Sequence, residues 1–131
     1  MASADDENIP SELRNFVFRY LDSVELVRVL LLLHSNPARE WSIDQLTSEL
    51  RSSRLSIEKR LADLYDRRIL RKSSETEKHS YTPYDGEMSR LIEQLSSFEK
   101  RFPYRLIDMI YSRREGALRE FANAFSFKKE K

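Results

Sequence analysis

The sequence predicts a mainly α-helical protein with one small β-hairpin. Apolar side chains recur at helical spacing over most of the 131 residues, and period-two alternation is confined to two short segments, 69–72 and 79–82. The chain has two glycines, two histidines and no cysteine. This composition argues against a phosphate-binding glycine loop, a disulfide framework and a thiolate or histidine-rich metal site. We therefore expect a protein that is not an enzyme and that uses no cofactor.

The length of the chain is usual for one domain. We expect residues 1–131 to form a single domain with an N-terminal tail and helix at 1–21, a core at 22–84 and C-terminal helices at 85–131. The longest apolar run, residues 29–33, is far shorter than a membrane span, and no basic-then-apolar leader opens the chain. These features predict a cytoplasmic protein that is not inserted in a membrane.

Two helices are predicted in the first third of the chain. Ser11 precedes apolar residues at helical spacing and is expected to be the N-cap of the first helix. Asp22 followed by Glu25 has the spacing of a capping box and predicts the start of the second. The second helix is apolar almost all round and should end at the Asn-Pro pair of residues 36–37, so we expect it to be the central buried helix.

Two further helices follow, joined by a short polar turn at residues 51–53. Ser42 and Gln45 have the spacing of a capping box and predict a short helix. The next helix is predicted over residues 54–67. Its inward side holds three apolar residues one helical turn apart, which should pack against leucines of the preceding helices. The three are Ile57, Leu61 and Leu64, and their expected partners are Leu30, Leu31 and Leu46.

The order helix, short helix, turn, helix and β-hairpin is that of a winged helix-turn-helix. The two short strands at 69–72 and 79–82, with the polar loop 73–78 between them, supply the wing. The predicted fold is therefore a mainly α winged helix-turn-helix with a small hairpin wing and extra N- and C-terminal helices.

Residues 41–84 resemble the winged-helix domains of bacterial transcription regulators of the MarR, PadR and ArsR types. In those families the recognition helix ends in the pattern L-x-x-x-G-L-[IV], and residues 64–70, LYDRRIL, match it with Arg68 where the glycine usually stands. The flanking helices loosely resemble the terminal, often dimerising helices of these regulators. The resemblance implies a transcription regulator that binds duplex DNA, without assigning a subfamily.

The distribution of charge also points to a polyanionic partner. Residues 1–50 hold 4 Lys and Arg against 9 Asp and Glu, residues 51–72 hold 8 against 3, and residues 73–131 hold 11 against 10. The balances are therefore −5, +5 and +1. A local excess of positive charge in a nearly neutral chain is typical of an element that faces nucleic acid.

The candidate DNA contacts lie on the recognition helix and the wing. The N-terminal residues of a recognition helix reach base edges in the major groove, while Lys and Arg at its margins neutralise phosphates. Arg54 is expected to reach guanine O6 and N7, and the wing cations to reach the neighbouring backbone or minor groove. The candidates are Ser53, Arg54, Ser56, Lys59 and Arg60 on the helix, and Arg71, Lys72, Lys78 and His79, taken as a surface residue, on the wing.

The same segment supports a second interpretation. Glu58, Asp63 and Asp66 lie on or beside the outward side of the recognition helix, where phosphate would repel them, and Leu55 is an apolar residue on that side. Winged helices also serve as protein-interaction modules, so the fold alone does not give DNA binding. The alternative is thus a winged-helix interaction module that does not bind DNA, and a third possibility is a purely structural dimerisation protein.

An apolar stripe in the C-terminal region predicts self-association. Leu91, Leu95, Phe98 and Phe102 recur at helical spacing and must be covered by the same chain or by a second one. A two-fold pair of winged helices also gains affinity for a palindromic site. We expect a homodimer built through the terminal helices.

Overall fold

The computed structural model describes residues 9–112, which belong to two compact units. One unit is Glu25–Ser96, and the other, the terminal unit, combines Met1–Val24 with Ser97–Lys131. The C-terminal helices expected over 85–131 therefore lie partly outside the described residues, and the single domain stays a prediction. Among the described residues, no helix is long and apolar enough to cross a membrane.

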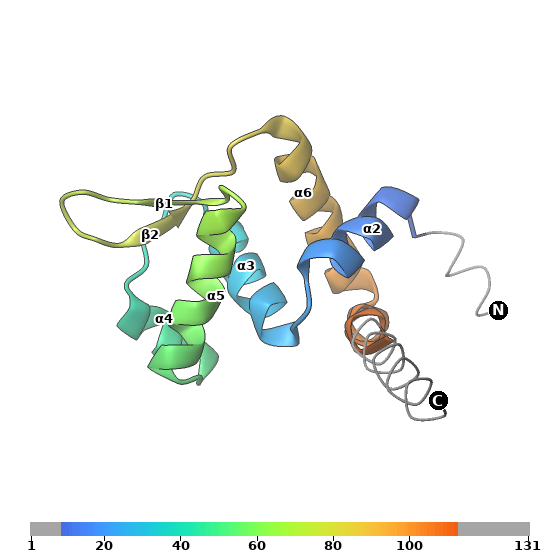
Figure 1. Ribbon diagram of the computed structural model, residues 1–131, viewed down its shortest axis with the longest axis horizontal. Coiled ribbons are helices and arrows are strands. Elements are labelled where there is room, and N and C mark those ends of the chain that lie inside the picture. The colour runs from blue at the N-terminus through green and yellow to red at the C-terminus, as the bar shows by residue number, and fades with distance from the viewer. Residues whose placement is uncertain (1–8, 113–131) are drawn as a thin grey trace, which may run out of the picture. The chain divides into compact units, whose positions relative to one another are not determined.

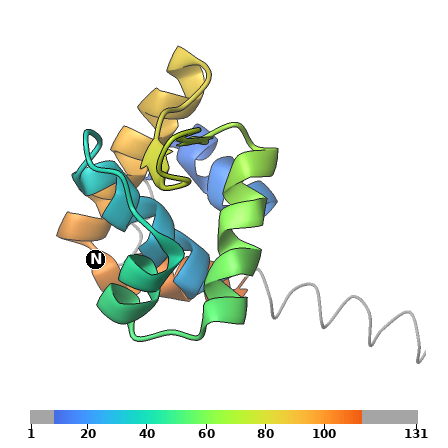
Figure 2. The same cartoon turned by 90° about the vertical axis from the view of Figure 1, so that its left-hand side faces the viewer.

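The unit Glu25–Ser96 is built around three helices, α3 (Val24–Ser35), α4 (Ile43–Leu50) and α5 (Arg54–Asp66). Helices α4 and α5 pack against each other and are joined by a short turn (Figure 1, Figure 2). The inward residues of α5 are buried as predicted, and so are Leu30 and Leu46, whereas Leu31 is only half-buried. This core holds α5 with its opposite side toward solvent.

Local hydrogen bonds fix the start of α4 and the turn between α4 and α5. The Ser42 hydroxyl accepts from the Gln45 backbone N–H at 3.1 Å, and the Gln45 side chain accepts from the Ser42 backbone N–H at 2.9 Å, so the predicted capping box is confirmed. Arg51 ends α4 in the left-handed conformation, with φ 52°. The Ser53 hydroxyl accepts from the backbone N–H of Ser56 and caps α5.

The wing is an antiparallel hairpin of β1 (Leu70–Lys72) and β2 (His79–Tyr81), within the segments that alternation predicted. Leu70 pairs with Tyr81 and Lys72 with His79. Trp41 adds a third position that the sequence did not predict. Its backbone N–H and carbonyl each bond to His79 at 2.7 Å, which ties the base of the wing to the residue just before α4.

Arg68 lies between α5 and the wing at the position where related patterns have glycine. Its φ is 58°, so the chain keeps the left-handed turn although the residue is not glycine. Its backbone N–H donates to the Tyr65 carbonyl at 2.9 Å, and its guanidinium lies 5.2 Å from the centre of the Tyr84 ring. The left-handed turn therefore forms with arginine where the pattern has glycine, at a conformational cost.

The N-terminal helices begin differently from the prediction. Helix α2 (Ser11–Tyr20) has Pro10, not Ser11, at its N-cap, and no side chain caps it, because Ser11 is already the first helical residue. Helix α3 begins at Val24, so Asp22 does not occupy its N-cap. The Glu25 carboxylate bonds to side chains of the turn and of α5, which overturns the predicted capping box.

The C-terminal part of the described chain contains α6 (Gly86–Arg101) and a separate helix over 103–112. Phe102 interrupts the two, and Pro103 begins the second, where its missing N–H costs nothing. Leu95 and Phe98 of the predicted apolar stripe are buried within the chain, and Leu91 and Phe102 are half-buried. Phe18, Tyr104 and Tyr111 are the large aromatic residues of the terminal unit that are exposed among the described residues.

Candidate nucleic-acid interface

Glu25 organises one edge of helix α5. Its carboxylate accepts hydrogen bonds from the hydroxyls of Ser52 and Ser56 and from Arg60 Nε, the last at 3.0 Å. The side chains of Arg60 and Glu25 are only 18% and 26% exposed. Two of the predicted DNA contacts, Ser56 and Arg60, are therefore half-buried and bonded within the protein.

Hydrogen bonding decides the protonation state of this carboxylate. Burial acts to raise the pKa of Glu25, but the hydrogen bonds from Ser52, Ser56 and Arg60, together with the charge of Arg60, outweigh burial and hold the pKa below its ordinary value. Glu25 is thus a carboxylate near neutral pH. It neutralises Arg60 and leaves no net charge in the network.

Arg54 is also paired, although it is exposed. Its Nη1 lies 2.7 Å from Asp44 of α4, and its Nε lies 3.1 Å from Glu58 one turn along α5. A guanidinium shared between two carboxylates has to give up both partners before it can fork onto a guanine. The geometry brings Arg54 to the surface where the sequence predicted it, but not as an unpaired cation.

Helix α5 has no net charge of its own. Its three cations, Arg54, Lys59 and Arg60, are matched by Glu58, Asp63 and Asp66. The excess of +5 in residues 51–72 therefore comes from outside α5. It comes from the turn before the helix and from the segment that leads into the wing, at Arg51, Arg67, Arg68, Arg71 and Lys72.

The first wing strand presents its cations to solvent. Arg71 and Lys72 are exposed, as is Lys59 on α5, and none of the three forms an ion pair with a carboxylate of residues 9–112. Lys78, at the end of the wing loop, is half-buried. The same loop carries exposed acids at Glu75 and Glu77, so the positive part of the wing is its strand and not its tip.

The sequence predicted that His79 lies on the surface of the wing. This prediction is wrong. His79 is 7% exposed, and its Nδ1 lies 2.6 Å from the Tyr65 hydroxyl. Burial lowers the pKa of His79, and the charge of Lys72 lowers it further. The side chain is a structural link between α5 and β2, because it bonds to Tyr65 of α5.

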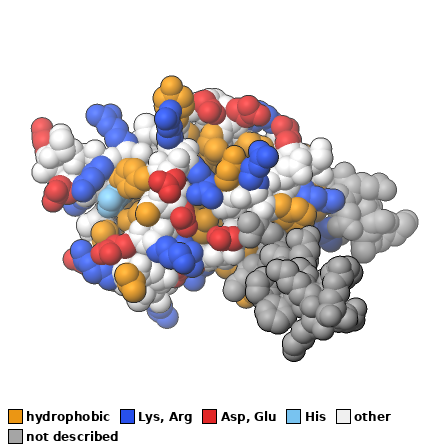
Figure 3. All heavy atoms as spheres, viewed as in Figure 1, with side chains coloured by type: hydrophobic (Ala, Val, Ile, Leu, Met, Phe, Trp, Pro, Cys, Tyr) orange, Lys and Arg blue, Asp and Glu red, His pale blue; other side chains and the backbone are white. Residues whose placement is uncertain are grey.

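The space-filling view shows how charged side chains in general are distributed on one face of the molecule. Acidic, basic and hydrophobic side chains are interspersed on it (Figure 3). Leu55, in the first turn of α5, is 78% exposed. The surface therefore combines separate cations with an apolar side chain.

The structure brings together most of the predicted site residues but gives them different roles. Ser53 caps α5, Ser56 and Arg60 bind Glu25, and Arg54 binds two acids, whereas Lys59, Arg71 and Lys72 remain open. Sequence reasoning missed the partners Glu25, Tyr65 and Trp41. A glutamate in the first turn of an otherwise apolar helix was the one available signal for Glu25.

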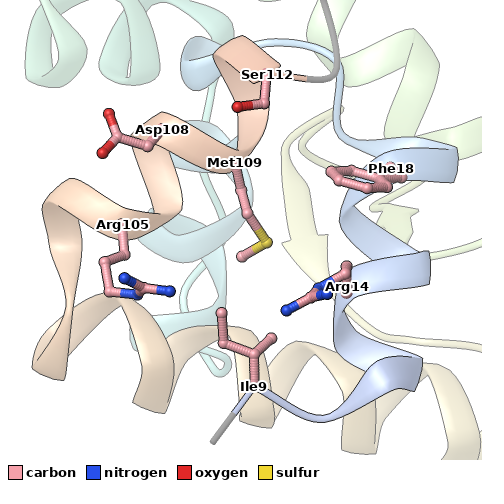
Figure 4. A pocket seen from close by; sticks show the side chains of 7 residues that line it. All are labelled: Ile9, Arg14, Phe18, Arg105, Asp108, Met109 and Ser112. Carbon is pink, nitrogen blue, oxygen red and sulfur yellow. The ribbon is translucent and has the colours of Figure 1, made fainter. Parts of the chain in front are cut away.

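A pocket of about 390 Å³ lies in the terminal unit, between α2 and the helix over 103–112 (Figure 4). Arg14 and Arg105 face its interior beside Ile9, Phe18 and Met109. Both arginines take part in other interactions, so neither is a cation left over for a ligand. We assign no function to this pocket.

Comparison with known proteins supports the fold. No family model and no curated protein sequence matches the chain. Among solved structures, the chain is similar to MepR, a transcription regulator of the Staphylococcus aureus multidrug efflux pump MepA, at a TM-score of 0.50 and 13% identity over 96% of this chain and 98% of MepR. The chain has the winged helix-turn-helix fold.

A second solved structure is that of Lactococcus lactis ZitR, determined as a cysteine-to-serine variant, with a TM-score of 0.47 and 12% identity. That match covers 79% of this chain and 72% of ZitR. The identities are too low to carry residue roles from either protein to this one.

Proposed function

We propose that this protein is a cytoplasmic transcription regulator that binds duplex DNA through α5 and the first wing strand. The observation that carries the proposal is the set of exposed, unpaired cations on that surface, Lys59, Arg71 and Lys72. Phosphate contacts by such residues supply most of the affinity of DNA-binding proteins. The fold, in which a helix and a hairpin are presented side by side, suits a major groove with its flanking backbone.

The test is binding to a random duplex library, followed by anisotropy titrations at several salt concentrations. We expect retardation at low salt and an affinity that falls as salt rises, because counterions are released from the phosphates. The double substitution Arg71→Ala and Lys72→Ala should weaken binding to every sequence. The double substitution Lys100→Ala and Arg101→Ala, which removes two exposed charges from α6, is the matched control. No retardation at low salt and high protein concentration would overturn the proposal.

A protein-interaction module is the second candidate. Leu55 favours it, because an exposed leucine beside the Arg54, Asp44 and Glu58 ion pairs is also the composition of a protein contact. In that case the chain should show no salt-dependent affinity for DNA. A protein partner, once found, should lose affinity on Leu55→Asp but not on Lys72→Ala.

We further propose a homodimer through the terminal helices. The predicted stripe contributes less to this than expected, because Leu95 and Phe98 are already buried within the chain. The exposed Phe18, Tyr104 and Tyr111 are the stronger support, since aromatic residues are enriched at interfaces. Light scattering at tens of micromolar protein should give twice the mass of one chain. A single-chain mass would contradict the dimer without affecting the DNA-binding proposal.

A further inference from the structure

The internal bonds of the recognition helix leave few side chains able to read bases. In its first two turns, Arg54 is held by Asp44 and Glu58, and Ser56 and Arg60 are held by Glu25. The Ser53 hydroxyl caps α5 by accepting from the backbone N–H of Ser56. Leu55 and Lys59 are the exposed side chains of these turns that make no such bond in the described structure.

These two residues lie four positions apart, so they are neighbours on one face of α5. Leu55 is the second residue of the helix and is 78% exposed, and Lys59 follows one turn later. The N-terminal residues of a recognition helix are those that reach base edges. The side chains of Leu55 and Lys59 therefore lie where a recognition helix contacts base edges.

The chemistry of the pair specifies what it can read. Leucine has no hydrogen-bonding group, and the apolar feature of the major groove is the C5 methyl of thymine. Lysine donates to guanine O6 and N7. One helical turn rises about 5.4 Å and one base step about 3.4 Å, so the two contacts fall roughly one to two base pairs apart.

We propose that α5 reads DNA through an apolar contact of Leu55 with a thymine methyl and a hydrogen bond of Lys59 to a nearby guanine, while Glu25 keeps Ser56 and Arg60 from the bases. This inference rests on the proposed DNA binding and names its specificity. It replaces Arg54 as the expected base-reading residue.

The test removes single methyl groups from the DNA. A preferred duplex is selected from a random library, and each thymine is replaced in turn by deoxyuridine, which lacks only the C5 methyl. We expect one position to lose affinity about fourfold with the unchanged protein, the effect of withdrawing roughly one methyl group from an apolar contact. With Leu55→Ala that position should no longer respond, and with Leu55→Met it should still respond.

A second arm tests the lysine. Lys59→Ala should lower affinity for the selected duplex about tenfold, and it should abolish the preference for guanine at a position one to two base pairs from the sensitive thymine. Arg60→Ala and Ser56→Ala are matched variants on the same helix and should leave the preferred bases unchanged. Thermal unfolding checks that each variant remains folded.

The outcomes distinguish base reading by Leu55 and Lys59 from DNA binding itself. Sequence-preferring binding in which no thymine responds, or in which the same thymine responds equally with Leu55→Ala, would overturn the inference and leave DNA binding intact. A changed base preference with Arg54→Ala or Arg60→Ala would overturn it as well. If no duplex is bound at low salt, both proposals fail, and Leu55 is then to be tested as a protein contact.

Discussion

The two ends of the surface formed by α5 and the wing treat their cations differently. At the N-terminal end of α5, Arg54 and Arg60 are held by acids from other helices. At the wing end, Arg71 and Lys72 are exposed and unpaired within residues 9–112. The cations of the first end are thus bound to acids of the same chain, and those of the second end are available to a polyanionic partner. Equal counts of positive charge in a sequence do not mean equal availability to a partner.

Glu25→Ala should have the largest effect on the N-terminal end of α5. Removing the carboxylate leaves Arg60 and two serine hydroxyls without their acceptor, and we expect a loss of about 1–3 kcal/mol in the free energy of unfolding. Asp44→Ala is the matched control, because it breaks an exposed ion pair with Arg54 and should cost less than about 1 kcal/mol. Urea denaturation measures both. Equal losses would mean that the Glu25 network is no more than a surface interaction.

The junction between the two ends offers a gain instead of a loss. Arg68 has φ 58°, a conformation that costs a non-glycine residue about 1 kcal/mol, so Arg68→Gly should stabilise the fold by a similar amount. The change also removes the contact with the Tyr84 ring, which lowers the gain. Arg67→Gly is the control, because Arg67 has an ordinary φ of −92° and should lose stability. A destabilised Arg68→Gly in thermal unfolding would contradict the backbone argument.

At the open end, the expected effect is on the salt dependence of binding. Lys72→Ala should weaken all duplexes alike and reduce the slope of log affinity against log salt by about 1, because one phosphate contact is lost. Arg60→Ala also removes one positive charge, but from the N-terminal end of α5. It should leave that slope unchanged, because Arg60 is bound to Glu25. A lower slope with Arg60→Ala would show that the Glu25 network opens on DNA.

Sequence patterns predicted several local features, although the expected N-caps of α2 and α3 were wrong, and they missed the distant features. The Ser42 and Gln45 capping box and the buried side of α5 follow from residues within four positions of each other. Glu25 meets Ser52, Ser56 and Arg60 across 27 to 35 residues. Helical periodicity does not encode such a meeting.

The burial of His79 was hidden for the same reason. Alternation in a two-stranded hairpin leaves open which face of the strand is covered, and Tyr65, which lies against the His79 ring, comes from α5. The His79 ring is buried against Tyr65, whereas Trp41 bonds to the His79 backbone. A single segment could therefore predict the strand but not its buried side.

The smallest expected effect concerns the base of the wing and is read from pH. Burial and the charge of Lys72 hold the pKa of His79 below the ordinary 6.5, so the unfolded chain binds a proton more readily than the folded one. Stability from this residue is present above pH 6.5 and is lost as the pH falls from there toward the lower folded pKa.

The lost stability should be on the order of 0.5 kcal/mol between pH 7.5 and pH 6. Glu25, with its lowered pKa, contributes in a separate window, because its stabilisation is lost only as the pH falls below about 4.5. Unfolding curves of the unchanged protein and of His79→Gln, taken from pH 7.5 to 5.5, isolate the histidine by difference. Parallel curves for the two proteins would show that His79 takes up its proton equally in the folded and unfolded states, and that its burial against Tyr65 does not disfavour the charged ring.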